Sequence, residues 1–296
     1  MKDMASIVIL GVIMGVAARI FMLRNDYRSY PSYSHGYVTH ISLGFIAAFL
    51  ASLAIPALME KEYTAVTFLV LAAQQFRDIR NMERETLSKL EELSLVPRGL
   101  DYIEGIAKVF EARNYLVMLV SLTTTGFAVF FNLQIGAIAG IISIFLTGFL
   151  MRGQFVRDIA EVKPGKLHFE KSLLMVDDIV IMNIGSPEAK EKILQDGVGV
   201  VIHPKDDNAR ATLNNLGQRQ AILHDVAALV GSKLETGEPD FTPLMRKNVD
   251  TGKLALFVVP NEKDIECIIE AIYRTPVLES ATQKPLSSDI GRKAAD

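Results

Sequence analysis

Long apolar runs are concentrated in the first half of this chain, and they limit what it can fold into more than any other feature. Half of the 296 residues are hydrophobic and the mean hydropathy is +0.26, yet residues 1–151 hold almost all of these runs. Residues 152–296 have the composition of a soluble domain. Because an apolar helix of about 20 residues matches the hydrocarbon thickness of a bilayer, the sequence predicts an α-helical multi-pass membrane domain followed by a second, soluble domain.

Five segments are predicted to cross the membrane. The first contains Arg19 near its end, from where a long side chain can reach the membrane interface. The third is short and only moderately apolar, and we expect it to continue as a helix into charged sequence. The last contains Gly136 and Gly140, a spacing of small residues that favours close helix packing. The predicted spans are residues 5–23, 41–59, 63–76, 115–133 and 135–151.

Basic residues are distributed unevenly between the connectors. They are frequent in residues 24–40 and 77–113 and after residue 151, whereas the other connectors contain only Lys2 and Lys61. Because cytosolic connectors are enriched in Lys and Arg, this pattern predicts an external N-terminus and a cytosolic C-terminal domain. The net charge of −3 and pI near 6.0 argue against a nucleic-acid partner, so the lipid bilayer is the expected environment.

A charged segment, residues 77–114, separates the two apolar blocks and is predicted to form a cytosolic helical hairpin. Apolar positions follow a helical spacing up to residue 95, Pro97 and Gly99 end that helix, and a second helix runs into the fourth span. Polar residues at the membrane edge are expected to form one patch, either an interfacial ion-pair network or a functional cavity. The patch consists of Asp26, Arg28, His35, Gln74, Gln75, Arg77, Arg113 and Asn114.

No catalytic motif can be recognised. The chain lacks HExxH, GxSxG and a phosphate-binding loop, and its predicted spans contain no carboxylate for an intramembrane aspartyl protease. His35 and His40 are five residues apart, which is not the spacing of a helical zinc pair, and we expect neither a metal nor a cofactor. If the protein is an enzyme, its candidate catalytic residues are Asp78, Glu83, Glu104 and Glu111, with His40 as a base.

Residues 152–280 are predicted to form a small cytosolic α/β domain. Strands at 178–184, 198–202 and 254–259 alternate with helices, which favours a mainly parallel sheet. Gly185 and Ser186 lie where a strand ends and a helix begins, so they are candidate anion ligands, with an ordinary helix cap as the alternative. Residues 281–296 are predicted to be a disordered tail.

Four segments carry a family resemblance. Tyr102 to Ala107 reads Tyr-Ile-Glu-Gly-Ile-Ala, and this hexapeptide, together with residues 64–69, 72–78 and 111–115, resembles the YIEGIA family of membrane proteins. The resemblance is strongest over residues 24–115. It implies a spore-forming Gram-positive source, a multi-pass membrane protein, and association with small partner proteins described as a capping complex. It identifies no catalytic residues.

These features lead to one expected function and one alternative. We expect a membrane protein whose regulatory cytosolic domain binds small capping-type protein partners, with residues 74–114 as the coupling surface. The alternative is a membrane-anchored protease that acts on a cytosolic substrate and is restrained by those partners. A transporter is disfavoured because the predicted spans place few polar groups near the middle of the membrane.

Overall fold

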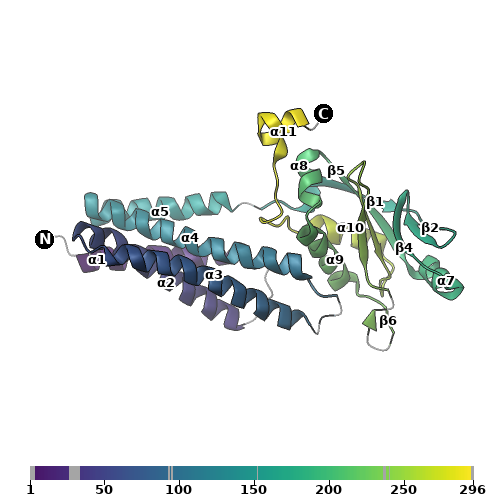
Figure 1. Ribbon diagram of the computed structural model, residues 1–296, viewed down its shortest axis with the longest axis horizontal. Coiled ribbons are helices and arrows are strands. Elements are labelled where there is room, and N and C mark those ends of the chain that lie inside the picture. Colours follow the sequence, from purple (N-terminus) through teal and green to yellow (C-terminus); the bar gives the residue numbers. More distant parts are fainter. Residues whose placement is uncertain are drawn as a thin grey trace. The chain divides into compact units, whose positions relative to one another are not determined.

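The computed structural model (Figure 1) describes residues 4–26, 34–92, 94, 96–151, 153–235, 238–239 and 241–294. The chain divides into two compact units, and the division passes through two helices. The helical unit consists of Met1–Glu85 and Ile106–Arg152. The C-terminal unit consists of Thr86–Gly105 and Gly153–Asp296.

Long helices form the helical unit, and two of them extend into the C-terminal unit. Asn132 caps the last of these helices, because its side chain accepts the N–H of Ile135 at 2.9 Å. The predicted break after residue 95 is observed as the gap between the third and fourth helices. The helices are α1 (Met4–Asp26), α2 (Ser34–Met59), α3 (Thr64–Glu91), α4 (Leu100–Phe130) and α5 (Leu133–Leu150).

Among the described residues, three helices are long and apolar enough to cross a membrane. They are Met4–Arg24 in α1, Gly36–Met59 in α2 and Leu133–Leu150 in α5. Length and composition therefore support three of the five predicted spans. The apolar part of α3 is short and leads directly into charged residues, and hydroxyl side chains interrupt the apolar sequence of α4.

The hydroxyl side chains of α4 are buried inside the helical unit. Ser121, Thr124 and Thr125 are all fully buried. The Ser121 hydroxyl donates to the carbonyl of Gly11 in α1 at 3.1 Å, and the two threonines donate to carbonyls one turn earlier in α4. Because every one of these hydroxyls has an acceptor, α4 can be less apolar than its neighbours and still pack against them.

Small residues allow the helices to approach closely. A Cβ atom at Gly15 of α1 would lie 2.6 Å from Ala48 Cβ of α2, and one at Gly136 of α5 would lie 2.6 Å from Ala128 Cβ of α4. Gly140 is also buried, against side chains of α4 and α1. The packing role predicted for Gly136 and Gly140 is confirmed.

The C-terminal unit is built on antiparallel sheets, which corrects the prediction of a mainly parallel one. One sheet has the strand order β1-β5-β9-β8 and the other has the order β2-β3-β4, and every neighbouring pair is antiparallel. The strands are β1 (Ala160–Gly165), β2 (Leu167–Glu170), β3 (Leu173–Val176), β4 (Ile179–Asn183), β5 (Val198–Pro204), β8 (Leu244–Lys247) and β9 (Leu254–Val258). A short ladder joins β6 (Leu234–Glu235) and β7 (Glu238–Pro239).

The prediction was wrong about strand direction because β1, β2, β3 and β8 were not recognised and one predicted strand was assigned to the wrong sheet. The predicted strand at 178–184 is β4, which pairs with β3 in the smaller sheet, so the central pair is β5 with β9. β9 is buried throughout, and β5 is buried except at its last two residues. Such continuous apolar runs fit a strand covered on both faces, whatever the direction of its neighbours.

Helices cover one face of the four-stranded sheet, and the smaller sheet covers the other (Figure 1). Val200, Ile202 and Leu256 pack with α9 and α10, whereas Val201 and Phe257 pack with β3 and β4. The alternation along β5 therefore builds two separate apolar layers. The helices of this unit are α6 (Val156–Ile159), α7 (Pro187–Asp196), α8 (Asp207–Leu213), α9 (Leu216–Val230) and α10 (Ile265–Arg274).

The segment predicted to be a disordered tail contains two short helical elements as far as it is described. Residues after 281 form η1 (Pro285–Ser287) and α11 (Asp289–Ala294). The N–H of Gln283 donates to the Thr212 hydroxyl at 3.1 Å, and the N–H of Leu286 donates to Asn208 Oδ1 at 2.9 Å. These bonds fasten the segment to α8.

The close packing at Gly15 makes it sensitive to the smallest substitution. We expect Gly15→Ala to destabilise the helical unit by about 1–3 kcal/mol, because the added methyl group overlaps α2 and α4. Gly126→Ala is the matched control, since its Cβ atom would meet only the end of the Ile55 side chain at 3.1 Å. Unfolding in detergent measures both variants, and equal stabilities would contradict this packing.

Candidate functional site

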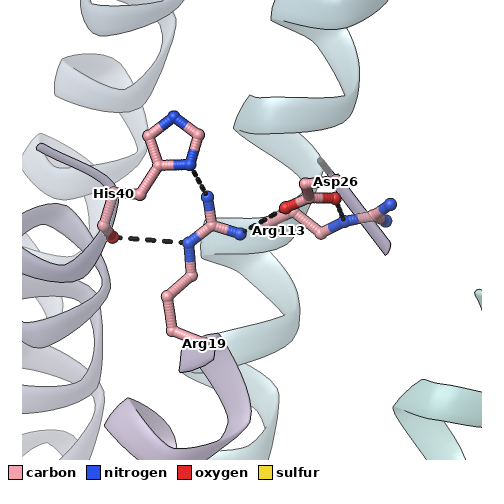
Figure 2. A network of polar contacts seen from close by, with 4 residues as sticks. All are labelled: Arg19, Asp26, His40 and Arg113. Atoms are coloured by element: carbon pink, nitrogen blue, oxygen red, sulfur yellow. Dashed lines mark hydrogen bonds and ion pairs between the residues drawn. The ribbon is translucent and has the colours of Figure 1, made fainter. Parts of the chain in front are cut away.

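A buried ionic network joins three helices of the helical unit (Figure 2). Arg19 of α1 donates through Nη1 to Asp26 Oδ2 at 2.9 Å and through Nε to the carbonyl of His40 at 3.3 Å. Arg113 of α4 donates to the other oxygen of Asp26 at 2.9 Å. We call Arg19, Asp26, His40 and Arg113 the Asp26 network. Its single carboxylate links the end of α1 to α4, while Arg19 links α1 to α2.

The histidine of this network acts as an acceptor. Arg19 Nη2 lies 2.8 Å from His40 Nδ1, and a guanidinium can only donate. Nδ1 of His40 is therefore unprotonated, which places the proton of the neutral ring on Nε2. This arrangement does not suit a base role for His40, because Nε2 carries the proton and the lone pair of Nδ1 is committed to Arg19.

Arg19 is buried rather than extended toward the membrane interface, which corrects our expectation. Its side chain is 0% exposed, although it lies within the apolar segment Met4–Arg24. The guanidinium lies 5.5 Å from the ring centroid of Phe110, which also packs on His40. Gly44 leaves room for the arginine stem, since a Cβ atom there would lie 2.6 Å from Arg19 Cγ. Removing such a charge from water is costly unless it is paired and hydrogen-bonded, as it is here.

The predicted polar patch is assembled only in part. Asp26 and Arg113 are brought together, and Asn114 follows in α4 with a fully buried amide that has no hydrogen-bond partner within the described residues. Arg28 and the side chain of His35 lie outside the described residues. Gln74, Gln75 and Arg77 are exposed on α3.

The candidate catalytic carboxylates lie in different surroundings. Glu111 accepts a hydrogen bond from Arg80 at 3.0 Å, Asp78 is exposed, and Glu104 is half-buried. Glu83 is buried, and this burial raises its pKa to about 7. Within the described residues, no group of three or more His, Cys, Asp or Glu side chains could hold a metal ion.

A second polar cluster lies in the C-terminal unit, where the hairpin between α3 and α4 packs on α9. We call Thr86–Gly105 the docked hairpin. The N–H of Tyr102 donates to Gln220 Oε1 at 3.0 Å, and His224 Nδ1 donates to the carbonyl of Val96 at 2.9 Å. The Tyr102 ring is buried and packs edge-on against His224. The sequence predicts this hairpin but contains no pattern that marks Gln220 or His224 as its partners.

Charged groups close the turn of the docked hairpin. Glu91, at the end of α3, accepts both the backbone N–H and the guanidinium of Arg98, and that guanidinium lies 5.9 Å from the Tyr102 ring centroid. Burial, together with the charge of Asp225, raises the pKa of Tyr102 to about 12, while Arg98 opposes the shift. Burial also raises the pKa of Asp225.

The candidate anion site after β4 is capped by side chains of the chain itself. The Ser186 hydroxyl accepts the N–H of Ala189 at 3.3 Å and donates to Glu188 at 2.5 Å. This hydrogen bond lowers the pKa of Glu188. The start of α7 already has a carboxylate beside it, so this arrangement is that of an ordinary helix cap.

Asp26 is the residue on which the ionic network depends. We expect Asp26→Asn to destabilise the helical unit by about 3–5 kcal/mol, because two buried guanidinium groups lose their shared carboxylate. The exposed Asp78→Asn is the matched control. A double variant that also carries Arg113→Gln should lose less than the sum of the single losses. Additive losses, measured by unfolding in detergent, would show that the pair does not interact.

The pKa of Tyr102 predicts an alkaline loss of stability. The unfolded phenol has a pKa near 10 and the folded one about 12, so the contribution of Tyr102 is complete below pH 10 and disappears as the pH approaches 12. Between pH 9 and 12, the free energy of unfolding should fall more steeply for the wild type than for Tyr102→Phe, and the difference should reach up to about 3 kcal/mol. Parallel curves would contradict a buried phenol.

Comparison with known proteins covers nearly the whole chain. Residues 7–288 match the family model described as YIEGIA protein. A protein of Bacillus subtilis (strain 168), named "Uncharacterized protein YphB", is 46% identical over 285 residues, which cover 96% of this chain and 96% of that protein. No solved structure matches the chain. The family resemblance of the Tyr102–Ala107 hexapeptide thus extends to both units, and the chain belongs to the YIEGIA family.

Proposed function

We propose that this chain is a multi-pass membrane protein whose C-terminal unit is a regulatory module for small capping-type protein partners. The docked hairpin would couple that module to the membrane helices. The observation that carries the proposal is the division of the chain, since Thr86–Gly105 packs with the C-terminal unit although it connects two helices of the helical unit.

The surface of the helical unit supports a membrane location. The outward face of α5 consists of large apolar side chains that water would not favour. Among them, Ile142, Phe145 and Phe149 are each more than 60% exposed. The 18-residue α5 is about 27 Å long, close to the hydrocarbon thickness of a bilayer. The proposal includes crossings by α3 and α4 in addition to α1, α2 and α5, because this places the docked hairpin on the same side as the C-terminal unit with which it packs. The basic residues of 24–40, of 77–113 and of the segment after residue 151 then all lie in the cytosol, and the N-terminus is external.

α4 is the element through which coupling can act. This 31-residue helix is about 46 Å long and carries Tyr102 near its start and Arg113 three turns later. Tyr102 takes part in the docked hairpin, and Arg113 takes part in the Asp26 network. A regulatory signal that changed the docking of Tyr102 would therefore act on the same rigid helix that holds Asp26.

Co-purification from the membranes of the native host tests the proposal. We expect tagged full-length protein to retain a small protein in stoichiometric amount, and the two purified proteins to rebind. The matched control is a variant with a substitution on the outward face of α5, Ile142→Leu, which should retain the partner equally well. A chain that purifies alone would contradict the proposal. A chain that shortens the added protein would instead support the protease alternative.

A further inference from the structure

The start of α4 depends on a side chain from a distant part of the chain. The first N–H groups of a helix have no partner within the helix and need an external acceptor. The residue before α4 is Gly99, which has no side chain to offer and adopts a φ of +77°. Gln220, which follows Tyr102 by 118 positions, accepts the Tyr102 N–H at 3.0 Å. Gln220 of α9 therefore does for α4 what an N-cap residue would ordinarily do.

Close backbone approach makes this arrangement specific. A Cβ atom at Gly99 would lie 2.5 Å from Gln220 Cδ, and one at Gly217 would lie 2.8 Å from the carbonyl oxygen of Asp101. The first turns of α4 and α9 are thus in direct contact through glycine. A larger residue at Gly99 would collide with Gln220, and one at Gly217 would collide with the backbone of Asp101.

A second contact involves the next turn of α4, at Gly105. Gln218, which is fully buried, accepts the N–H of Leu278 at 2.7 Å and donates to the carbonyl of Pro276 at 3.1 Å. These bonds position the segment that follows α10, and Ser280 in it would meet a Cβ atom at Gly105 at 2.6 Å. Tyr102 and Gly105 of the family hexapeptide, which are i and i+3 on one face of α4, therefore contact α9 and residues 276–280 respectively.

We propose that α9 and residues 276–280 form a latch that holds the first turn of α4, and that release of the latch unwinds this turn. Without Gln220, the turn would begin at an uncapped glycine, and the Tyr102 N–H would lose its acceptor. The hexapeptide is then the segment that the latch holds, and Tyr102 and Gly105 are the residues that position it. The latch is a property of the chain itself, and only its use by a protein partner rests on the proposed function.

Amide hydrogen exchange of the full-length protein in nanodiscs, without any partner, tests the latch. We expect Gln220→Leu to speed exchange at Tyr102 and Ile103 by on the order of 5- to 30-fold, because the cap is lost. Gln220→Glu should stay near the wild type, since a carboxylate oxygen accepts the same N–H and its charge favours a helix start. Gln195→Leu, on the exposed face of α7, is the matched control.

Two results would overturn the inference. One is unchanged exchange at Tyr102 in Gln220→Leu. The other needs no variant: in the wild type, Tyr102 should open together with the amides of α9, and opening together with the amides of α5 would contradict the latch. If exchange behaves as expected but no partner co-purifies, the latch stands and the proposed function fails. If a partner binds but the latch does not open, the proposed function stands and the latch inference fails.

Discussion

Asp26 shares its carboxylate between Arg19 and Arg113, and the packing of the helical unit depends on that shared contact. A guanidinium buried within an apolar helix is tolerated only where its charge and its donors are matched. Arg19 meets this requirement through Asp26, His40 and the face of Phe110, and these partners come from three different helices. The network therefore specifies which faces of α1, α2 and α4 pack together. Apolar packing alone would specify these faces less sharply.

α4 carries that specificity into the second part of the structure. The helix is less apolar than α1, α2 or α5, because its hydroxyls face other helices and its first turns leave the bundle. Those first turns contain the family hexapeptide, and their capping comes from α9. The C-terminal unit holds the start of α4, and the helical unit holds its middle. α4 is therefore well suited to transmit a conformational change from one unit to the other. This property gives a physical reason for the hexapeptide where no catalytic role is evident.

Much of this architecture could be read from the sequence, and the exceptions have physical causes. Residue spacing predicted α1, α2, α5, the hairpin with its break near Gly99, and the cap at Ser186, because each depends on neighbouring residues. Strand direction was mispredicted because β5 and β9 are buried on both faces, and such strands have the same apolar sequence pattern in parallel and antiparallel sheets. Arg19 was visible as a charge in an apolar run, but nothing local indicated that Asp26 and Arg113 would enclose it. No sequence pattern marked Gln220, since its partner lies 118 positions away.

α9 of the C-terminal unit holds the start of α4, and photo-crosslinking in the intact membrane protein tests this contact most directly. A benzophenone amino acid in place of Tyr102 keeps an aromatic ring at the position that packs against His224. After irradiation, mass spectrometry should find the crosslink on the α9 peptide that contains Gln220 and His224. Crosslinks found only on α1, α2 or α5, with none on α9, would contradict the account.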